Sequence, residues 1–406
     1  QQRLNQFAHL NERANAVYEQ LSSAHKSAFY AMILFPIRSS YLVNKKVLLA
    51  ERSRLWARQK RAATNPLALE ATRAQKALLQ ELEFYNEVNA DGKWQYMMSP
   101  MSAAELPGWA HETQRFWAEP AVASYNAPDQ AILSAALEGS AANLSDEHTA
   151  ALPLFNKPAN SRYFIDVFNQ GARALAWRAS SHQDWIILSQ AQGDGDSRIF
   201  VTIDWSKLVS PGRVSGMITL KGAGKRYRVQ VDAVVPSAIP ENLPRALENN
   251  RRVVIEAEAF SEKRDVEPLG WKLLKQAAAS GDAMTVYPSR AKSIAPQQVL
   301  TSSPSMTYTF YCISTGSVKI LTQALPTHPI SSDQAGQRYA ISLNGEPPKL
   351  VDVYSKEYSK AWGLNTLRAA ALGETKHQIH RAGLQTLQVW MVDTGVVVDK
   401  FTVDFL

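Results

Sequence analysis

The 406-residue chain has an ordinary globular composition, with 45% hydrophobic and 20% charged residues. Its length favours two or three domains, and no apolar run approaches the roughly 20 residues that a membrane-spanning helix needs. The net charge of +7 bears on solubility and nonspecific binding rather than on fold. A single cysteine, Cys312, excludes an intrachain disulfide, and its aromatic, β-branched surroundings predict a small buried side chain.

The first 118 residues are predicted to form a helical bundle. Steps of three and four residues separate the members of an apolar stripe that predicts one helix, which Pro36 should end or kink. A second helix follows, and Asn65-Pro66 predicts an N-cap and first turn for a third. The chain begins inside the first helix with no initiator methionine, so we expect it to be the C-terminal part of something longer. The stripe consists of Leu10, Ala14, Val17, Leu21, Ala24, Ala28, Ala31 and Phe35.

The second helix is rich in basic residues. One interpretation is a stripe that binds phosphate groups, and the other is a solvated helix face. No stacking aromatics are interleaved and no nucleic-acid motif follows, which favours the solvated face. These residues are Lys45, Lys46, Arg52, Arg54, Arg58, Lys60 and Arg61.

The stretch GKWQYMMSP (92–100) groups Lys93 and Trp94 with two methionines. Packing against the end of the bundle is the favoured interpretation. The alternative is that Lys93 and Trp94 face a neighbouring domain or a substrate, which makes them candidate interface residues.

Residues 119–158 are rich in Ala, Pro and Ser and are predicted to be a connector. Alternating strands then predict an immunoglobulin-like β-sandwich over residues 159–236. Turns are expected at GDGD (193–196) and KGAGK (221–225). The two aspartates of GDGD could suggest calcium, but the match to a calcium loop is too short and a hairpin turn is favoured.

A second all-β unit of jelly-roll character is predicted over residues 245–406. Asn344-Gly345 is a strong turn signal, and 383–406 is interpreted as a terminal hairpin. The expected fold class is therefore a helical bundle followed by an immunoglobulin-like sandwich and a C-terminal jelly-roll sandwich.

Acidic residues interrupt two apolar rows of this last unit. Asp399 stands in the row of alternate residues 397–405, and Glu256 and Glu258 share one face of VVIEAEAF (253–260). Buried carboxylates need partners. The favoured interpretation is hydrogen bonding to backbone or arginine near the end of the sheet. The alternative is a structural calcium ion between the first and last strands.

No catalytic constellation is evident in the sequence. It contains no G-x-S-x-G elbow, no H-E-x-x-H zinc motif and no phosphate loop between a strand and a helix. With 37 acidic residues, a pair of glycosidase carboxylates cannot be assigned by spacing.

Several stretches, in their order along the chain, resemble the C-terminal half of glycoside hydrolase family 115, the xylan α-1,2-glucuronidases. The resemblance depends on collinearity over nearly the whole chain rather than on any single motif. The last unit also resembles galactose-binding-like carbohydrate-binding modules. The stretches are AFYAMILFPIRSSYLVNKK (28–46), YNEVNADGKWQYMM (85–98), RYFIDVFNQG (162–171), WIILSQ (185–190), VTIDW (201–205), VVIEAEAF (253–260), DAMTVYP (282–288) and GLQTLQVWMVDTGVVVDKFTVDF (383–405).

The resemblance implies a scaffold or accessory region rather than a catalyst. Family 115 enzymes remove (4-O-methyl)glucuronic acid from glucuronoxylan with carboxylates on a barrel domain, and none of the matched stretches carries them. We therefore assign no catalytic residue, no metal ligand and no cofactor, with structural calcium left as an alternative. The partners implied are glucuronoxylan, the upstream catalytic domains and, as one arrangement, a second copy of the chain; no nucleic acid or membrane is expected.

The resemblance also implies a bacterial periplasmic or secreted location. An alternative function is a stand-alone carbohydrate-binding protein that uses the jelly roll. Trp362, in KAWGLN, is the candidate sugar-facing aromatic for that function, although it could equally cover the core.

Overall fold

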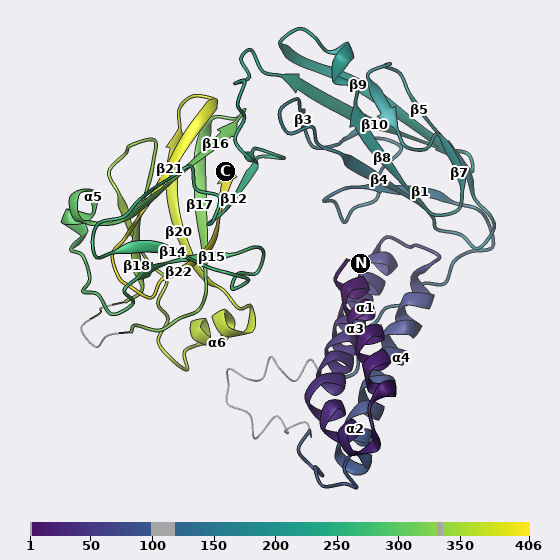
Figure 1. Cartoon of the computed structure of the whole chain (residues 1–406). Helices are drawn as coiled ribbons and strands as arrows, with labels where there is room; N and C mark the ends of the chain where they lie inside the picture. The colour runs from purple at the N-terminus through teal and green to yellow at the C-terminus, as the bar shows by residue number, and fades with distance from the viewer. Residues whose placement is uncertain (1, 99–117, 331–333, 335) are drawn as a thin grey trace.

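The computed structural model describes residues 2–98, 118–330, 334 and 336–406. Figure 1 shows three bodies in chain order: a helical bundle, a middle β-sandwich that lies over one end of the bundle, and a C-terminal β-sandwich beside it. The predicted fold class, helices followed by β-sandwiches, is confirmed. None of the helices in the described part of the chain is both long and apolar enough to cross a membrane.

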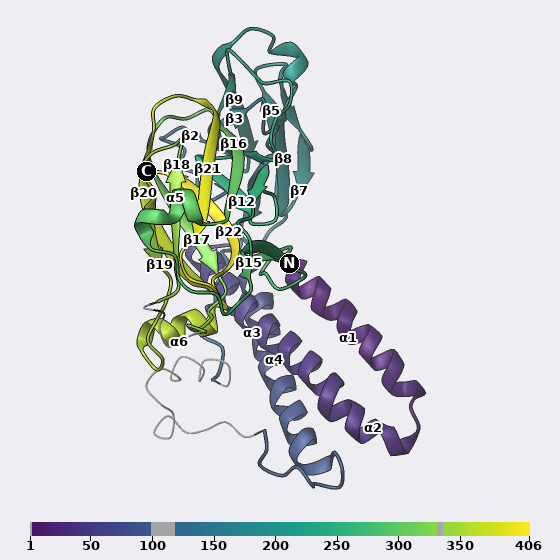
Figure 2. The same ribbon diagram turned by 60° about the vertical axis from the view of Figure 1, so that its left-hand side comes forward.

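The bundle is built from antiparallel helical rods (Figure 2). The predicted first helix is wrong in two places. The chain reverses at Leu21–Ser22, where Ser22 has an extended backbone, and the helix then continues through Pro36 without ending. Pro36 fits because a π-helical turn precedes it, in which the Phe35 N–H donates to the carbonyl of Tyr30 five residues back. The segments are α1 (Gln2–Gln20), α2 (Ser23–Phe29), η1 (Tyr30–Leu34), α3 (Phe35–Arg58), α4 (Thr64–Glu83) and η2 (Phe84–Val88).

A polar cluster fastens the rods of the bundle to one another. Tyr30 donates to Glu81 (2.8 Å), and Arg38 donates to both Glu81 (3.1 Å) and Asn15 (2.5 Å). These side chains come from η1, α4, α3 and α1, so one network reaches every rod. Burial, and then the bond to Glu81, raise the pKa of Tyr30.

Asn65 is not the N-cap that the sequence predicts. Helix α4 begins at Thr64, whose hydroxyl donates to the carbonyl of Arg61 (2.7 Å). The Asn65 amide instead exchanges two hydrogen bonds with the backbone of Tyr125 (3.1 and 2.9 Å). This pair joins α4 to the chain that enters the middle sandwich.

The middle sandwich packs a four-stranded sheet against a six-stranded sheet. The predicted connector, residues 119–158, contributes three strands to it. The first of these strands, β1, is buried along its whole length, and its small residues gave no alternating signal. The four-stranded sheet has the order β1 (Leu133–Leu137), β4 (Tyr163–Asn169), β8 (Ser197–Ile203) and β6 (Ile186–Leu188). The other contains β2 (Ala150–Ala151), β3 (Phe155–Asn156), β5 (Ala176–Ser181), β7 (Gln192–Asp194), β9 (Gly212–Gly222) and β10 (Lys225–Val235).

The two expected turns of this sandwich differ in outcome. KGAGK closes the β9–β10 hairpin, with positive φ at Ala223 and Gly224 (45° and 76°), as a two-residue turn requires. GDGD is not a hairpin turn, because β7 pairs with β5 in one sheet whereas β8 pairs with β4 and β6 in the other. It carries the chain between the two sheets.

The C-terminal sandwich consists of two six-stranded sheets around one core cluster, which includes the buried thiol of Cys312. Burial raises the pKa of that thiol to about 12. One sheet contains β11 (Ala246–Leu247), β13 (Glu262–Arg264), β16 (Ser305–Cys312), β18 (Arg338–Leu343), β19 (Lys349–Asp352) and β21 (Gly383–Met391). The other contains β12 (Arg252–Glu256), β14 (Gly270–Leu274), β15 (Ala283–Tyr287), β17 (Gly316–Ala324), β20 (Ala371–Ile379) and β22 (Val397–Phe405). Short helices α5 (Val299–Ser302) and α6 (Lys360–Leu367) lie outside the sheets.

The predicted terminal hairpin is wrong, because β21 and β22 belong to different sheets. The chain crosses the sandwich between them. At this crossover Asp393, 1% exposed, accepts hydrogen bonds from the Arg338 guanidinium (2.7 and 3.0 Å), from the Arg338 N–H (2.9 Å) and from Ser293 (2.6 Å). The Asn344-Gly345 turn between β18 and β19 is as predicted, with φ of 52° and 77°.

Polar contacts connect the middle sandwich to the C-terminal one. Asn156 donates to the carbonyl of Glu248 (2.9 Å), while Ser161 and Tyr163 both donate to the side chain of Asn249 (2.8 and 2.5 Å). The buried Glu248 carboxylate accepts the N–H of Ser314 (2.9 Å) on the other side. The junction is therefore hydrogen bonded on both sides rather than formed by a free linker.

Candidate functional site

A β-bulge in β22 explains the carboxylate in the apolar row. Against β17, Lys400 and Val398 pair with consecutive residues, so Asp399 has no partner in the ladder. The extra residue reverses the alternation: Val398 joins Phe401 in the core cluster, whereas Val397 does not. Asp399 is still 1% exposed. The row predicted from the sequence is therefore wrong before the bulge, and Asp399 is the bulged residue itself.

The loop between β14 and β15 covers the carboxylates of Asp399 and Glu258. The Ala279 N–H donates to Asp399 Oδ2 (3.3 Å), and the Asp282 N–H donates to Glu258 Oε1 (3.1 Å). Gly281 has a φ of +69°, and a Cβ built there would lie 2.2 Å from Glu258 Oε1. A glycine is thus required for the loop to approach this closely.

Lys400 lies within ion-pair distance of two of the acidic side chains. Its Nζ is 3.7 Å from Glu256 Oε2 and 3.7 Å from Asp399 Oδ1, too long for a hydrogen bond to either. The Ser280 hydroxyl donates to both Glu256 oxygens (3.0 and 3.2 Å) and contacts Lys400. One ammonium group therefore lies within ion-pair distance of two carboxylates.

Two carboxylate oxygens of this site, Glu258 Oε2 and Asp399 Oδ1, are buried and accept no hydrogen bond. The hydrogen-bonding interpretation accounts for their sister oxygens, but not for these two. Oxygen ligands at a partly neutralised carboxylate group suit calcium. In the described part of the chain no three His, Cys, Asp or Glu side chains are arranged to hold a metal ion. Glu258 and Asp399 therefore offer two buried oxygens but do not form, with Glu256, a three-residue metal site.

Lys93 and Trp94 follow η2 at the end of the bundle. The Trp94 ring is half-buried and packs against the bundle core, and Lys93 Nζ lies 4.8 Å from its centroid. Asn86 binds the backbone of Met98 in both directions (3.2 and 2.9 Å), which closes the loop that carries both residues. Packing thus occupies one face of Trp94, while Lys93 is exposed.

Trp362 lies on α6 of the C-terminal sandwich and does not belong to the same site as Lys93 and Trp94. Ser359 caps α6 by accepting the Trp362 N–H (3.2 Å). The half-buried indole packs against Tyr358, with ring centroids 5.3 Å apart. Tyr358, 71% exposed, is the more accessible of the two rings, and the sequence reasoning overlooked it although it lies only four residues away.

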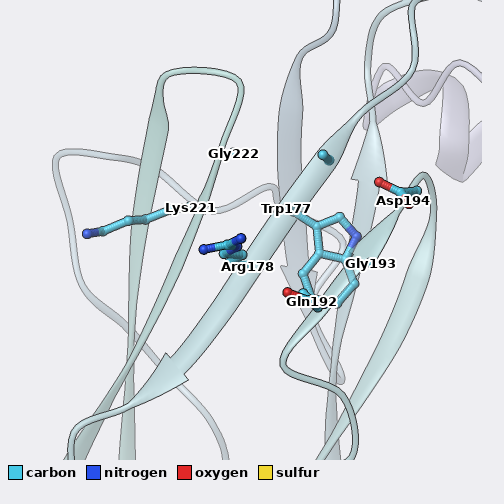
Figure 3. A pocket seen from close by; sticks show the side chains of 8 residues that line it. Trp177, Arg178, Gln192, Gly193, Asp194, Lys221 and Gly222 are labelled. Carbon is cyan, nitrogen blue, oxygen red and sulfur yellow. The ribbon is translucent and has the colours of Figure 1, made fainter.

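A shallow cavity of about 560 Å³ lies on the six-stranded sheet of the middle sandwich. Figure 3 shows Lys221 and Arg178 extending to the same side from neighbouring strands, while the Trp177 indole lies under Gly193. Asp194 is the acidic group that lines this cavity. The residues that line this cavity present charged side chains and backbone groups, but no nucleophile and no pair of carboxylates.

His377 forms a hydroxyl–imidazole–carboxylate series with Thr375 and Glu346. Nε2 lies 2.7 Å from Thr375 Oγ1, and Nδ1 contacts Glu346. The imidazole is 6% exposed, and burial lowers its pKa against the opposing bond to Glu346. Because the ring is enclosed, the series holds the β18–β19 turn against β20 and is not an accessible nucleophile.

The family model of the glycosyl hydrolase family 115 C-terminal domain matches residues 247–406. A comparison with curated proteins finds no match. Among solved structures, a family GH115 4-O-methyl-alpha-glucuronidase with specificity for decorated arabinogalactans is similar over 100% of this chain and 33% of its own, with 14% identity and a TM-score of 0.51. The chain thus spans a third of that structure.

Two carbohydrate-binding modules match a smaller part of the fold. A family 35 module from Clostridium thermocellum covers 38% of this chain and 98% of its own, at 14% identity and a TM-score of 0.26. The C-terminal family 6 module of a laminarinase from Zobellia galactanivorans covers the same shares, at 14% identity and a TM-score of 0.23.

Residues 247–406 therefore match the model of the glycosyl hydrolase family 115 C-terminal domain. The resemblance to the C-terminal half of this family is confirmed over these residues by the family model and over the whole chain by the fold. The described residues form a bundle and two sandwiches and contain no catalytic barrel.

Proposed function

We propose that this chain is the accessory C-terminal region of a xylan α-1,2-glucuronidase-like glycoside hydrolase and is not catalytic by itself. The observation that carries the proposal is the family 115 C-terminal domain at residues 247–406, on a chain whose whole fold matches a third of a family 115 glucuronidase. The glycan acted on by the complete enzyme is glucuronoxylan in this proposal, and the location is periplasmic or secreted.

The surface of the bundle supports an accessory role. Side chains of the predicted apolar stripe are exposed, including Leu10 (42%) and Val17 (47%) on α1, and Met32 of η1 is 75% exposed. Contiguous apolar surface marks where one protein meets another, and the proposal assigns these side chains to such a contact. The catalytic domains of the same enzyme are the partner that the proposal assigns to this surface.

A second candidate function is stand-alone sugar binding by the C-terminal sandwich. The observation that favours it is the Tyr358–Trp362 pair, since an exposed aromatic ring can stack on a sugar face. The half-buried Trp362 leaves one accessible ring rather than a broad platform.

One experiment separates the two candidates. The chain and its Tyr358→Ala variant are titrated with glucuronoxylan oligosaccharides by calorimetry, with Tyr354→Ala, another exposed tyrosine, as the matched control. The accessory proposal predicts that Tyr358→Ala leaves any heat of binding unchanged. Binding that falls tenfold or more in Tyr358→Ala alone would favour the stand-alone sugar-binding protein.

A further inference from the structure

A groove of about 600 Å³ lies between α3 and the four-stranded sheet of the middle sandwich. Leu48 and Leu55 of α3 and Leu137 of β1 form apolar walls, and Leu48 is 38% exposed. Arginines from both bodies line the rest. The groove belongs to neither body alone, so it exists only because the bundle and the sandwich are joined.

One indole ring holds two guanidinium groups in this groove. The Arg52 guanidinium lies 4.6 Å from the centroid of Trp56, and that of Arg61 lies 4.9 Å from it. Stacking fixes a planar guanidinium by its face and leaves the in-plane N–H donors available for other partners. In Arg61 the guanidinium also lies 3.9 Å from the Phe168 centroid, and its Nε donates to Gln59 (2.7 Å), so its terminal nitrogens are the donors that remain for a ligand. The predicted solvated face is wrong for Lys46 (1% exposed) and Arg61 (5% exposed), and Trp56 is the stacking aromatic that the sequence reasoning overlooked.

The positive charge of the groove exceeds its negative charge. Asp166 is the acidic residue among the described lining residues, and it already accepts two hydrogen bonds from Arg198 (2.7 and 3.1 Å). Its distance to the Arg61 guanidinium is 3.6 Å. Arg52 forms no ion pair with any described residue, which leaves one guanidinium without a carboxylate.

We propose that this groove binds the carboxylate of an acidic sugar, with the carboxylate held by Arg52 and Arg61 and the sugar ring lying on the leucine wall. Guanidinium forks match a carboxylate in geometry and charge. The apolar wall and the volume suit a ring larger than a bare oxyanion, since ligand cavities run from about 300 to 1,000 Å³. The choice of glucuronic acid as the sugar rests on the proposed function.

The test is calorimetric titration of the full chain with three probes: an aldouronic oligosaccharide, the neutral xylo-oligosaccharide of the same backbone length, and inorganic phosphate. We expect the aldouronic probe to bind and Arg52→Gln to weaken it at least tenfold. Arg54→Gln is the matched control, since Arg54 lies on the same helix but pairs with Glu51 outside the groove, and it should bind as the wild type does. Arg52→Lys keeps the charge without the planar fork and should bind more weakly than the wild type.

Four results would overturn the proposal. Equal binding of the neutral probe would remove the role of the carboxylate, and equal or tighter binding of phosphate with the same Arg52 dependence would make this a general oxyanion site. If the wild type does not bind the aldouronic probe, the proposed site is wrong. It is also wrong if Arg52→Gln, shown to be as thermally stable as the wild type, binds the probe equally well. None of these results bears on whether the chain releases glucuronic acid from glucuronoxylan, so the proposed function is tested separately.

Discussion

Asp399 and Glu258 each leave one buried oxygen without a hydrogen-bond donor. A buried acceptor that has lost water without replacement costs about 1–3 kcal/mol, and more when it is charged. Lys400 is too distant to supply the missing bonds. A cation bound by these two oxygens would remove this cost.

The calcium alternative predicts that calcium raises the melting temperature of the chain and that Asp399→Asn abolishes the increase. At 100 times the dissociation constant, a ligand specific to the folded state adds about 2.7 kcal/mol. Differential scanning calorimetry with calcium and with chelator measures this. Asp404→Asn, on the same strand but paired with Arg252, is the control and should keep the increase. If calcium does not change the melting temperature of the wild type, the calcium alternative is wrong.

We expect the free energy of unfolding to decrease at acidic pH because of His377. Burial holds its pKa below the ordinary value, so the folded state binds a proton less readily than the unfolded chain does. As pH falls through the unfolded pKa of about 6.5, the unfolded state gains protons first and stability decreases, by at most about 1.4 kcal/mol per pH unit.

The measurement is denaturant unfolding between pH 7.5 and 5. His377→Gln should flatten the pH dependence, whereas His328→Gln, an exposed histidine, should not. An identical slope in the wild type and His377→Gln would show that another group is responsible.

At the scale of elements, the crossover between β21 and β22 depends on the buried Arg338–Asp393 pair. Removing one member of such a pair leaves the other charge uncompensated, at a cost of about 3–5 kcal/mol. We expect Asp393→Ala to lower the free energy of unfolding by that order. Asp404→Ala, which breaks an exposed pair, should cost less than about 1 kcal/mol. Equal losses in the two variants, measured by denaturant unfolding, would show that the crossover does not depend on this pair.

Many of the strands were predictable from alternation, because each face of such a strand meets one environment, whereas the three strands in the predicted connector were not. The partners of the predictable strands were not predictable. The 383–406 segment has the local signature of a hairpin, but β22 pairs with β12, β15 and β17 far along the chain. The same limit applies to GDGD, where the local turn is real and the sheet assignment of its two strands depends on distant residues.

The candidate sites show the same division. The sequence predicts that Asp399 and the two glutamates need partners, but the bulge that turns Asp399 out of the row depends on pairing with β17. The sequence holds one signal that was overlooked, because Arg52 and Trp56 are four residues apart on α3 and so share a helix face. The contact of Arg61 with Trp56 could not be predicted, because Arg61 lies beyond the end of α3. The sequence shows which residue types are available for a site. It does not show which residues from different elements come together in the fold.

At the scale of the whole molecule, hydrogen bonds join the three bodies in series. Gln170 and Asn143 of the middle sandwich both donate to the carbonyl of Gln59 at the end of the bundle (2.8 and 3.1 Å), and Asn249 takes two bonds at the other junction. These contacts hold the bodies in a defined arrangement (Figure 2). A defined arrangement of the three bodies is what the proposed accessory role requires.

The most direct test of this account is an assay of glucuronic acid release from glucuronoxylan by the purified, folded chain. A family 115 enzyme with its barrel intact serves as the positive control under the same conditions. The account predicts no release above the buffer blank over a time course in which the control consumes its substrate. Release that rises with the concentration of the pure chain would contradict it, and would place catalytic carboxylates within these 406 residues.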